Sequence, residues 1–172
     1  MSEIKSWTTH RDAKQQKLEN AASLLDGKFA KTQNAKELLE LLIDSDDKVV
    51  LEGDNQKQAS FLSKVLASVD PEKVHGLHMI MSSISRPEHL DLFDLGIANK
   101  MDFSFAGPQS TRVSQMIADG TMQVGDIHTY LELYARLFVD LIPNVVLVAA
   151  DKVDRDGNFY IFMITELTPV FV

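Results

Sequence analysis

The residues with the clearest potential for chemistry form the polar run EGDNQKQ (residues 52–58), which directly follows an apolar run. Asn55 and Gln58 stand three positions apart, the spacing at which a helix-capping side chain and one in the first turn exchange backbone hydrogen bonds. A helix that starts at the end of a strand also directs free N–H groups at an anion or an oxyanion. In that second interpretation Glu52 and Gln56 face the same pocket. Both interpretations remain open at this point.

Four further polar turns follow the other apolar runs of the chain. They are SSISRP (residues 82–87), GPQS (107–110), His128-Thr129 and Asp151-Lys152. If the apolar runs are parallel strands of one sheet, their carboxyl ends meet at one edge, which is where open α/β sheets bind ligands. The sequence therefore predicts a polar crevice along that edge.

Several polar residues have a simpler explanation than catalysis. Ser-Arg-Pro-Glu (residues 85–88) matches a capping box with proline in the first turn, so Glu88 is predicted to cap a helix. His75 and His78 stand three positions apart on a predicted strand and point to opposite faces, which argues against a shared metal ion. His128, at a strand–helix junction, is either a proton carrier or a hydrogen-bonded structural residue.

The segment DKVDRDGN (residues 151–158) has the acidic composition of a calcium-binding loop but not its pattern. Lys152 occupies a ligand position of the EF-hand loop, and no glutamate stands at the closing position. Asp156-Gly157 is instead a turn sequence, which predicts a reversal into a strand at Phe159–Ile164, antiparallel to Val145–Ala150. We therefore expect a C-terminal β-hairpin and no metal ion.

The hydrophobic pattern predicts the elements that position these residues. Strands are predicted at 48–52, 74–81, 101–106, 123–127 and 145–150, and helices at 13–25, 56–69 and 110–118, with one more that residues 85–88 open and that runs to about residue 98. Asn34 with Glu37 is predicted to cap one more helix, and Thr129 with Glu132 another, which ends at Pro143. The buried face of this last helix is predicted to consist of Leu131, Tyr134, Ala135, Phe138, Val139 and Ile142.

The predicted strands recur about every 25 residues, which is the rhythm of βα units. Near-continuous apolar strands such as VVLVAA are typical of a parallel sheet covered on both faces. The sequence thus predicts an α/β fold, with a mainly parallel sheet and helices on both faces. We expect residues 1–33 to form a helical extension and residues 34–172 a single α/β domain.

Composition excludes several classes of function. The formal net charge is -8 and no basic stripe is present, so we expect no nucleic-acid partner. The chain has no cysteine, which removes disulfides and thiolate chemistry. It shows no Gly-rich dinucleotide motif, no phosphate-binding loop and no serine nucleophile motif. The polar N-terminus and the absence of a long apolar run predict a cytoplasmic protein with no membrane contact.

Three long segments resemble the N-terminal part of malonate decarboxylase alpha subunits. They are VVLEGDNQKQASFLSKVL, RPEHLDLFDLGIANKMDFSFAGPQSTRVSQMIADG and IHTYLELYARLFVDLIPNVVLVAADKVDRDGNFY, and the resemblance extends over about residues 20–160. The stretch VVLVAADKVDRDGN is also similar, more distantly, to the coenzyme A transferase family. The resemblance implies a coenzyme A transferase-like N-terminal domain.

The resemblance also implies a reaction. Acetate on the thioester of an acyl carrier protein is exchanged for malonate, and the malonyl-carrier protein is then decarboxylated by other subunits. The thioester is carried on the phosphoribosyl-dephospho-coenzyme A arm of the carrier protein. The implied partners are the carrier protein, the decarboxylase subunits and malonate, and we expect an oligomer. The residues expected to contact the thioester or malonate are Gly53, Asn55, Gln56, Lys57, Arg86, Gly107, Gln109 and Arg112.

The catalytic residue stays unassigned. Members of the family continue through a second half, where the resemblance places the nucleophilic glutamate, and this sequence ends at Val172. After Asn158 it reads FYIFMITELTP where the family has a glycine-proline-asparagine turn, so we expect a truncated or diverged alpha subunit. Glu52 is available at a strand end, but availability alone does not make it the nucleophile. The alternative is a non-catalytic module that holds the prosthetic arm or a partner subunit.

Overall fold

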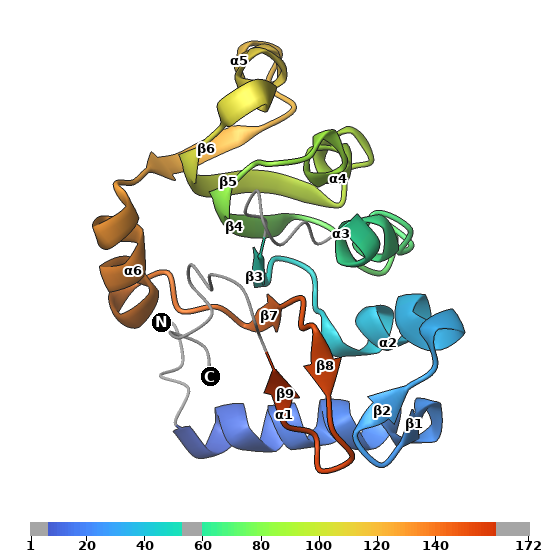
Figure 1. The fold of residues 1–172 in the computed structure, drawn as a ribbon. Coiled ribbons are helices and arrows are strands. Elements are labelled where there is room, and N and C mark those ends of the chain that lie inside the picture. Colours follow the sequence, from blue (N-terminus) through green and yellow to red (C-terminus); the bar gives the residue numbers. More distant parts are fainter. Residues whose placement is uncertain (1–6, 53–59, 161–172) are drawn as a thin grey trace.

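A computed structural model gives the fold of the chain and describes residues 7–52 and 60–160 (Figure 1). Its centre is a sheet of parallel strands in the spatial order β6-β5-β4-β3-β7. The strands are β3 (Lys48–Leu51), β4 (Leu77–Ser83), β5 (Ala98–Phe105), β6 (Gln123–Ile127) and β7 (Val145–Leu147). The predicted parallel α/β sheet is therefore confirmed.

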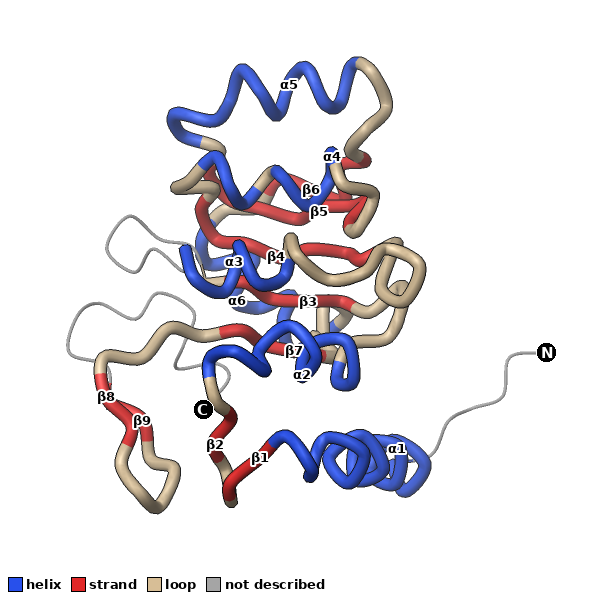
Figure 2. Tube along the Cα trace, turned by 90° about the vertical axis from the view of Figure 1, so that its right-hand side faces the viewer, coloured by secondary structure: helices blue, strands red, loops and turns tan. Residues whose placement is uncertain are grey.

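Helices cover both faces of this sheet, again as predicted, but unequally (Figures 1 and 2). One face carries a layer that runs from α2 to α5, and α6 (Tyr130–Val139) lies on the opposite face. The elements of the layer are α2 (Ala35–Leu42), α3 (Ser60–Leu66), η3 (Pro87–His89), α4 (Asp91–Asp94), η4 (Gly107–Gln109) and α5 (Ser110–Ala118).

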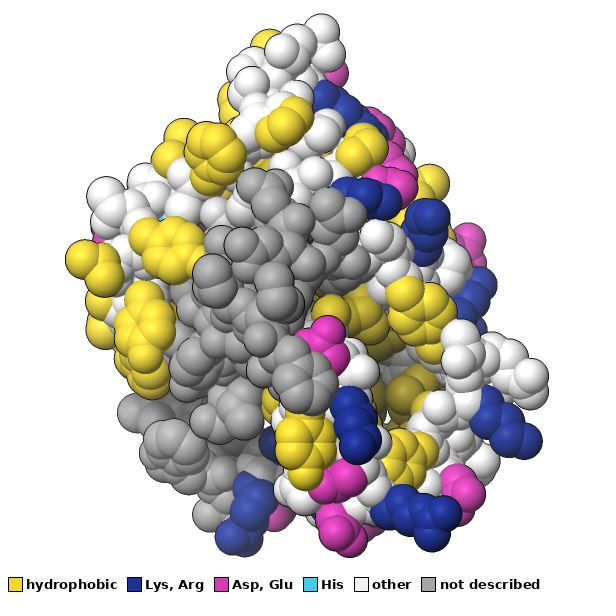
Figure 3. Space-filling view, viewed as in Figure 1, with side chains coloured by type: hydrophobic (Ala, Val, Ile, Leu, Met, Phe, Trp, Pro, Cys, Tyr) yellow, Lys and Arg dark blue, Asp and Glu magenta, His cyan; other side chains and the backbone are white. Residues whose placement is uncertain are grey.

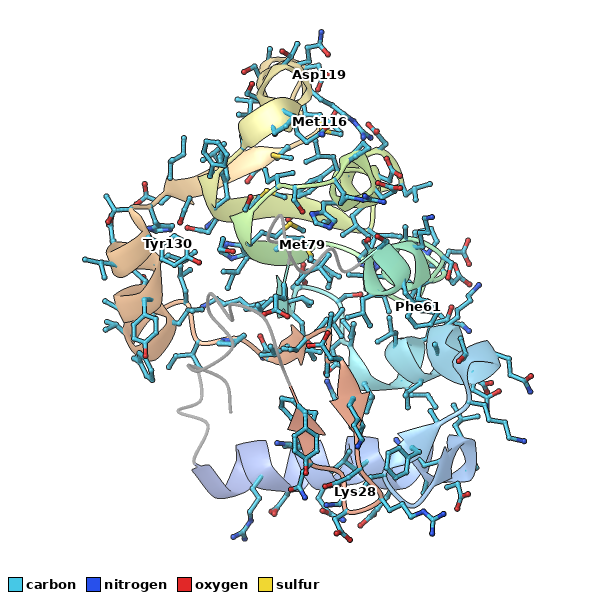
Figure 4. All side chains as sticks on the ribbon, in the orientation of Figure 1. Lys28, Phe61, Met79, Met116, Asp119 and Tyr130 are labelled. Atoms are coloured by element: carbon cyan, nitrogen blue, oxygen red, sulfur yellow. The ribbon has the colours of Figure 1, made fainter. Side chains whose placement is uncertain are left out.

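The two faces of the sheet differ in composition because successive strand residues point to opposite sides. Toward the α2–α5 layer the three central strands present a continuous group of apolar side chains, among them Val49, Leu51, Met79, Met81, Met101 and Phe103. Met79 of β4 and Met116 of α5, both labelled in Figure 4, belong to this large buried cluster. On the α6 side a smaller apolar cluster consists of Val50, Ile80, Leu133, Leu137 and Leu141.

Smaller elements lie outside the sheet, below it in the view of Figure 1. They are α1 (Trp7–Ala21), η1 (Ala22–Leu24), β1 (Leu25–Asp26), β2 (Phe29–Ala30), η2 (Thr32–Asn34), β8 (Lys152–Val153) and β9 (Phe159–Tyr160). Lys17 of α1 joins the main domain through Asp44 at 2.7 Å and the Leu42 carbonyl at 3.0 Å. The domain boundary after residue 33 stays a prediction. In the part of the chain that the structure describes, no helix has the length and apolar character of a membrane span.

The C-terminal hairpin is present, although its partner strand differs from the prediction. Gly157 has φ +84, a left-handed conformation that glycine adopts easily, and the chain reverses there. β9 pairs antiparallel with β8, in the register Val153↔Phe159, and not with the strand at 145–150. β7 ends at Leu147, since the chain leaves the sheet after that residue. The part of the predicted strand beyond Tyr160 lies outside the described residues.

Two predicted helix caps are wrong, and one is confirmed. Asn34 makes no capping hydrogen bond, because residues 32–34 already form the short helix η2 that runs into α2. Ser85 does not cap η3 either, since Arg86 occupies the N-cap position and makes no side-chain cap. The continuous helix predicted from residues 85–88 to about residue 98 is instead η3 followed by α4. By contrast, Thr129 and Glu132 form a complete capping box at the start of α6.

The predicted buried face of α6 is also wrong. Leu133 and Leu137 face the sheet, whereas the predicted core residue Leu131 is 84% exposed and Phe138 is 60% exposed. Tyr134, Val139 and Ile142 are exposed as well. Both sides of this helix carry apolar residues at helical spacing, so periodicity alone could not choose between them. The exposed apolar side chains appear as the yellow groups at the left edge of the molecule in Figure 3.

Candidate functional site

The strand order reverses direction between β3 and β7, which makes this point the topological switch of the sheet. Crevices at such points, outside the carboxyl ends of the strands, are the usual ligand sites of open α/β sheets. The polar run that begins at Glu52 starts here, directly after β3. The predicted site residues Gly53, Asn55, Gln56 and Lys57 lie outside the described residues.

Glu52 is buried at this switch point and is 6% exposed. Its backbone N–H donates to the Leu147 carbonyl at 3.0 Å, and its side-chain Oε2 accepts from the Ala149 N–H at 3.3 Å. The carboxylate therefore holds the chain that follows β7 against the end of β3. This geometry gives Glu52 a positioning role and argues against its use as an exposed nucleophile.

The segment after β4 forms the second part of the edge. Arg86 lies half-buried, with its Nε 3.7 Å from Oε2 of Glu88. Within the described residues, Ser85 Oγ and both ring nitrogens of His89 are buried without a hydrogen-bond partner. Buried polar atoms are normally satisfied, so these atoms stand out as available for further hydrogen bonds. Burial lowers the pKa of His89 to about 4, with Glu88 opposing and Arg86 adding to this shift, so its imidazole is neutral at neutral pH.

Gly107 and Gln109 follow β5, at the edge where the sequence predicts them. Ile84 N–H donates to the Phe105 carbonyl at 2.9 Å, which keeps the ends of β4 and β5 adjacent. Gly107 has φ +52, and a side chain there would meet the ring of Phe105 at 2.9 Å. Glycine is thus required by both conformation and space. Gln109 is half-buried and precedes the first residue of α5.

Arg112 lies near this edge, but its guanidinium already binds other residues of the chain. Its Nη1 donates to the Pro87 carbonyl at 2.8 Å, and its Nη2 donates to Asp91 at 2.8 Å and to Asp94 at 2.5 Å. Burial would lower the pKa of Arg112, but the hydrogen bonds to the two aspartates outweigh it and raise the pKa. The guanidinium therefore clamps α5 to η3 and α4, which argues against the predicted contact with malonate.

A buried polar network that the sequence did not predict lies on the α6 face of the sheet. Asp102 of β5 is 2% exposed and accepts hydrogen bonds from Nε2 of His78 and, at 2.6 Å, from Nε2 of His128. Burial alone would raise the pKa of Asp102, but the bonds from both histidines outweigh it and lower the pKa. His128 is thus a hydrogen-bonded residue, one of the two roles predicted for it.

Gly125 of β6 shows how closely this network is packed. A Cβ atom at that position would lie 2.0 Å from Oδ2 of Asp102, so only glycine leaves room for the carboxylate. An isolated glycine within a predicted strand was the one indication in the sequence of such a close approach. A cleft of about 210 Å³ lies beside this network, and its lining includes Asp102, Gly125, Lys48, Lys100 and Arg136.

The carboxyl edge as a whole gathers polar and charged side chains from three turns. It brings Glu52, the segment 85–89 and the segment 107–109 to the ends of three adjacent strands. Arg86 supplies a cation there. Ser85 and His89 supply polar atoms that lack partners within the described part of the chain. No exposed nucleophile is evident among the residues of this edge that the structure describes.

Sequence comparisons give the chain a clear set of relatives. A family profile described as "Malonate decarboxylase, alpha subunit, transporter" matches residues 6–172. A curated relative from Malonomonas rubra, named "Acetyl-S-ACP:malonate ACP transferase", is 49% identical over 153 residues. The match covers 88% of this chain and 28% of the relative.

Two solved structures of malonate decarboxylase chains are also similar to this chain. A malonate decarboxylase alpha subunit from Acinetobacter baumannii is 61% identical with a TM-score of 0.88, over 90% of this chain and 29% of that one. A chain of a Pseudomonas malonate decarboxylase hetero-tetramer in complex with malonate is 59% identical with a TM-score of 0.87, over 90% of this chain and 28% of that one. The chain thus spans less than a third of the length of these relatives.

Proposed function

Because the chain belongs to the malonate decarboxylase alpha subunit family, we propose that it contributes an α/β unit to an acyl-carrier-protein transferase. The proposed reaction exchanges acetate for malonate on the thioester of an acyl carrier protein. The C–S bond to the acetyl group breaks and a C–S bond to one carboxyl carbon of malonate forms, while an oxygen of that carboxylate passes to the acetyl group, which leaves as acetate. The sequence identity of 49% to a transferase of that name supports this proposal, although the match covers 28% of that relative.

The observation that carries the proposal is the position of Glu52, the first residue of the polar run, at the switch point between β3 and β7. A prosthetic arm such as phosphoribosyl-dephospho-coenzyme A is long and anionic, and a crevice at a switch point accommodates ligands of that shape. In this proposal Gly53, Asn55 and Gln56 provide donors for the thioester oxyanion. Gly107 and Gln109 border the arm from the end of β5.

Malonate is a dianion, so its site requires a cation. Arg86 and Lys57 are the proposed contacts, whereas the charge of Arg112 is paired with Asp91 and Asp94. Glu52 is proposed as the residue that holds the chain after β7 in place, since its carboxylate accepts the Ala149 N–H. The attacking carboxylate of the reaction is not assigned to any described residue.

A role in holding the prosthetic arm without chemistry is the second candidate. It is favoured by the engagement of Glu52 with the backbone, which leaves this carboxylate buried rather than directed at a substrate. The exposed apolar side of α6 favours association with other chains in either case, and the carrier protein and decarboxylase subunits are the proposed partners. The proposed location is the cytoplasm, as expected from the sequence, because malonate and acetate are small soluble acids.

Two measurements test these proposals. The chain is mixed with acetyl-carrier protein and malonate, and malonyl-carrier protein is followed by mass spectrometry. Turnover supports the transferase and excludes a purely holding role, whereas binding of the carrier protein without turnover supports the holding role. Absence of both turnover and binding would contradict the two proposals together.

The cationic contact is tested by calorimetric titration with malonate. Arg86→Gln is expected to weaken malonate binding at least tenfold, and Arg86→Lys to restore part of it, because the contact depends on charge. Lys14→Gln, an exposed position on α1, is the control for the change in net charge. Equal loss in the Arg86→Gln and Lys14→Gln variants would place the malonate site elsewhere.

A further inference from the structure

The junction of β6 and α6 brings two exposed carboxylates and one buried imidazole together. Asp126, His128 and Glu132 each direct one ligand atom to the same place, and these atoms all lie within 4.8 Å of one another. We propose that these three residues bind a divalent transition-metal ion such as Zn²⁺. The site is separate from the proposed acyl-transfer chemistry and does not depend on it.

His128 provides the observation that distinguishes this cluster from an ordinary group of surface acids. Its side chain is fully buried, and Nε2 lies 2.6 Å from Oδ1 of Asp102. The other ring nitrogen, Nδ1, is buried without a hydrogen-bond partner in the part of the chain that the structure describes. It lies 3.8 Å from Oε1 of Glu132. An unsatisfied buried nitrogen beside a carboxylate requires an explanation.

The hydrogen bond to Asp102 determines which nitrogen carries the proton. Oδ1 of Asp102 lies 2.6 Å from Nε2 of His128, and Oδ2 of the same carboxylate is hydrogen-bonded to Nε2 of His78, so Asp102 accepts from both rings. Nε2 of His128 must therefore be the N–H donor, and in a neutral imidazole Nδ1 then has a free lone pair. A carboxylate that orients a histidine in this way, with the other nitrogen on the metal, is the usual support of metal-binding histidines.

Each of the two carboxylates has one oxygen that is not used by a backbone N–H and that can coordinate a metal ion. Oε2 of Glu132 accepts from the Thr129 N–H at 3.4 Å as part of the capping box, which leaves Oε1 on the side of His128. Oδ1 of Asp126 accepts from the Ile127 N–H at 2.9 Å, which leaves Oδ2.

Arg136 is the competing cation at this site. Its Nη1 lies 3.6 Å from Oδ2 of Asp126. The same guanidinium is bound at 2.5 Å through both Nε and Nη2 to Asp140, so its charge is already satisfied there.

The ligand set selects the class of metal. Metal–ligand bonds of about 2.0 to 2.2 Å place ligand atoms closer together than 4.8 Å, so the exposed side chains of Asp126 and Glu132 must move slightly inward on binding. An imidazole with two carboxylates suits Zn²⁺, Co²⁺ or Mn²⁺, whereas Mg²⁺ and Ca²⁺ prefer oxygen ligands alone. Three protein ligands also leave a coordination position for water or a ligand carboxylate.

Calorimetric titration of the full chain with Zn²⁺ tests the proposal. Glu132→Gln is the informative variant, because glutamine preserves the capping box while it removes the charged ligand. Glu37→Gln is the matched control, since Glu37 is also an exposed acid in the first turn of a helix. We expect Glu132→Gln and Asp126→Asn each to weaken Zn²⁺ binding at least tenfold, and Glu37→Gln to leave it unchanged. Mg²⁺ is expected to bind far more weakly than Zn²⁺.

Nuclear magnetic resonance of the histidine side chains provides a second measurement that does not depend on affinity. Zn²⁺ is expected to shift the resonance of Nδ1 of His128 and to leave its Nε2–H bound to Asp102.

Asp102→Asn is expected to weaken Zn²⁺ binding about 10- to 100-fold, because the hydrogen bond that orients His128 is lost. Equal Zn²⁺ affinity of the unsubstituted protein and Glu132→Gln, equal affinity for Mg²⁺ and Zn²⁺, or a Zn²⁺-dependent shift confined to other histidines would overturn the proposal.

Discussion

The two faces of the central sheet solve the problem of burial in different ways. Toward the α2–α5 layer the sheet presents methionine, valine, leucine and phenylalanine, and one continuous apolar cluster fills the space. Toward α6 the same strands present His78, Asp102 and Lys48 beside a few apolar residues. Among the residues that the structure describes, α6 is the helix that covers this second face, and its outer side carries exposed apolar residues (Figures 1 and 3).

The difference shows that parallel strands need not be apolar on both faces. Burial of an ionised carboxylate is costly unless hydrogen bonds replace its contacts with water, and two histidines provide them for Asp102. On the apolar face, His89 is buried without a partner among the described residues and responds by a lowered pKa. The buried charge on the α6 face thus depends on hydrogen bonds from two histidines. The apolar face instead buries the imidazole of His89 in its neutral form. The following predictions test this contrast, beginning with the largest effect.

Asp102→Ala is expected to have the largest effect, about 3 to 5 kcal/mol of unfolding free energy. The substitution leaves two buried imidazole N–H groups without their acceptor. Because the pKa of Asp102 is lowered in the fold, its stabilisation is present above the ordinary value of 3.8 and is lost as the pH falls below it. Urea unfolding between pH 3 and pH 7 measures both effects.

Met79→Ala on the opposite face is the control for this experiment. It is expected to cost about 2 to 5 kcal/mol through loss of apolar contact and cavity formation, and to leave the pH dependence unchanged. A similar pH dependence in the Met79→Ala and Asp102→Ala variants would contradict the assignment of that dependence to Asp102.

His89→Phe is expected to reduce the loss of stability in mild acid. The folded-state pKa of His89 is about 4 and its ordinary value is 6.5, so the unfolded chain binds more protons between these values. Stability is therefore lost as the pH falls from 6.5 to 4, by about 3 kcal/mol for this group. The measurement is the difference in unfolding free energy between the two proteins across that range. An imidazole resonance of His89 that titrates near 6.5 would disprove the predicted contribution.

Gly125→Ala is expected to cost about 1 to 3 kcal/mol, because its Cβ would lie 2.0 Å from Oδ2 of Asp102. The carboxylate or β6 must shift, and the hydrogen bonds of the network weaken. Thermal unfolding measures the loss, and side-chain resonances of His78 and His128 report the change in hydrogen bonding. A loss below about 0.5 kcal/mol with unchanged resonances would show that the network has room to spare.

Leu131→Ala is expected to have the smallest effect, within about 0.5 kcal/mol, because the side chain is 84% exposed. Leu133→Ala, two positions along the same helix, removes a fully buried side chain and is expected to cost about 2 to 5 kcal/mol. Chemical denaturation of the two variants side by side tests which face of α6 packs on the sheet. Equal losses would mean that the outer side of α6 is also covered in solution.

Much of the fold could be predicted from the sequence because it depends on local patterns. Apolar runs such as KVVL and VVLVAA predicted parallel strands, and Thr129 with Glu132 predicted the start of α6. Asp156-Gly157 predicted the reversal of the C-terminal hairpin. The meeting of the polar turns at one edge could be predicted from the parallel arrangement alone, because the carboxyl ends of parallel strands lie at the same edge of the sheet. The caps at Asn34 and Ser85 failed because short helical turns begin one or more residues earlier or later than the pattern suggests.

The candidate sites depended on contacts between residues far apart in the sequence. His78, Asp102 and His128 meet only because β4, β5 and β6 are neighbours, and no local pattern links them. Arg112 had the charge expected of a malonate ligand, but only the packing of α5 against α4 assigned that charge to Asp91 and Asp94. The hydrophobic spacing predicted a helix at α6 with apolar residues on two sides, either of which could pack on the sheet. The tertiary structure decided which face is buried, because packing against Val50 and Ile80 selects Leu133 and Leu137.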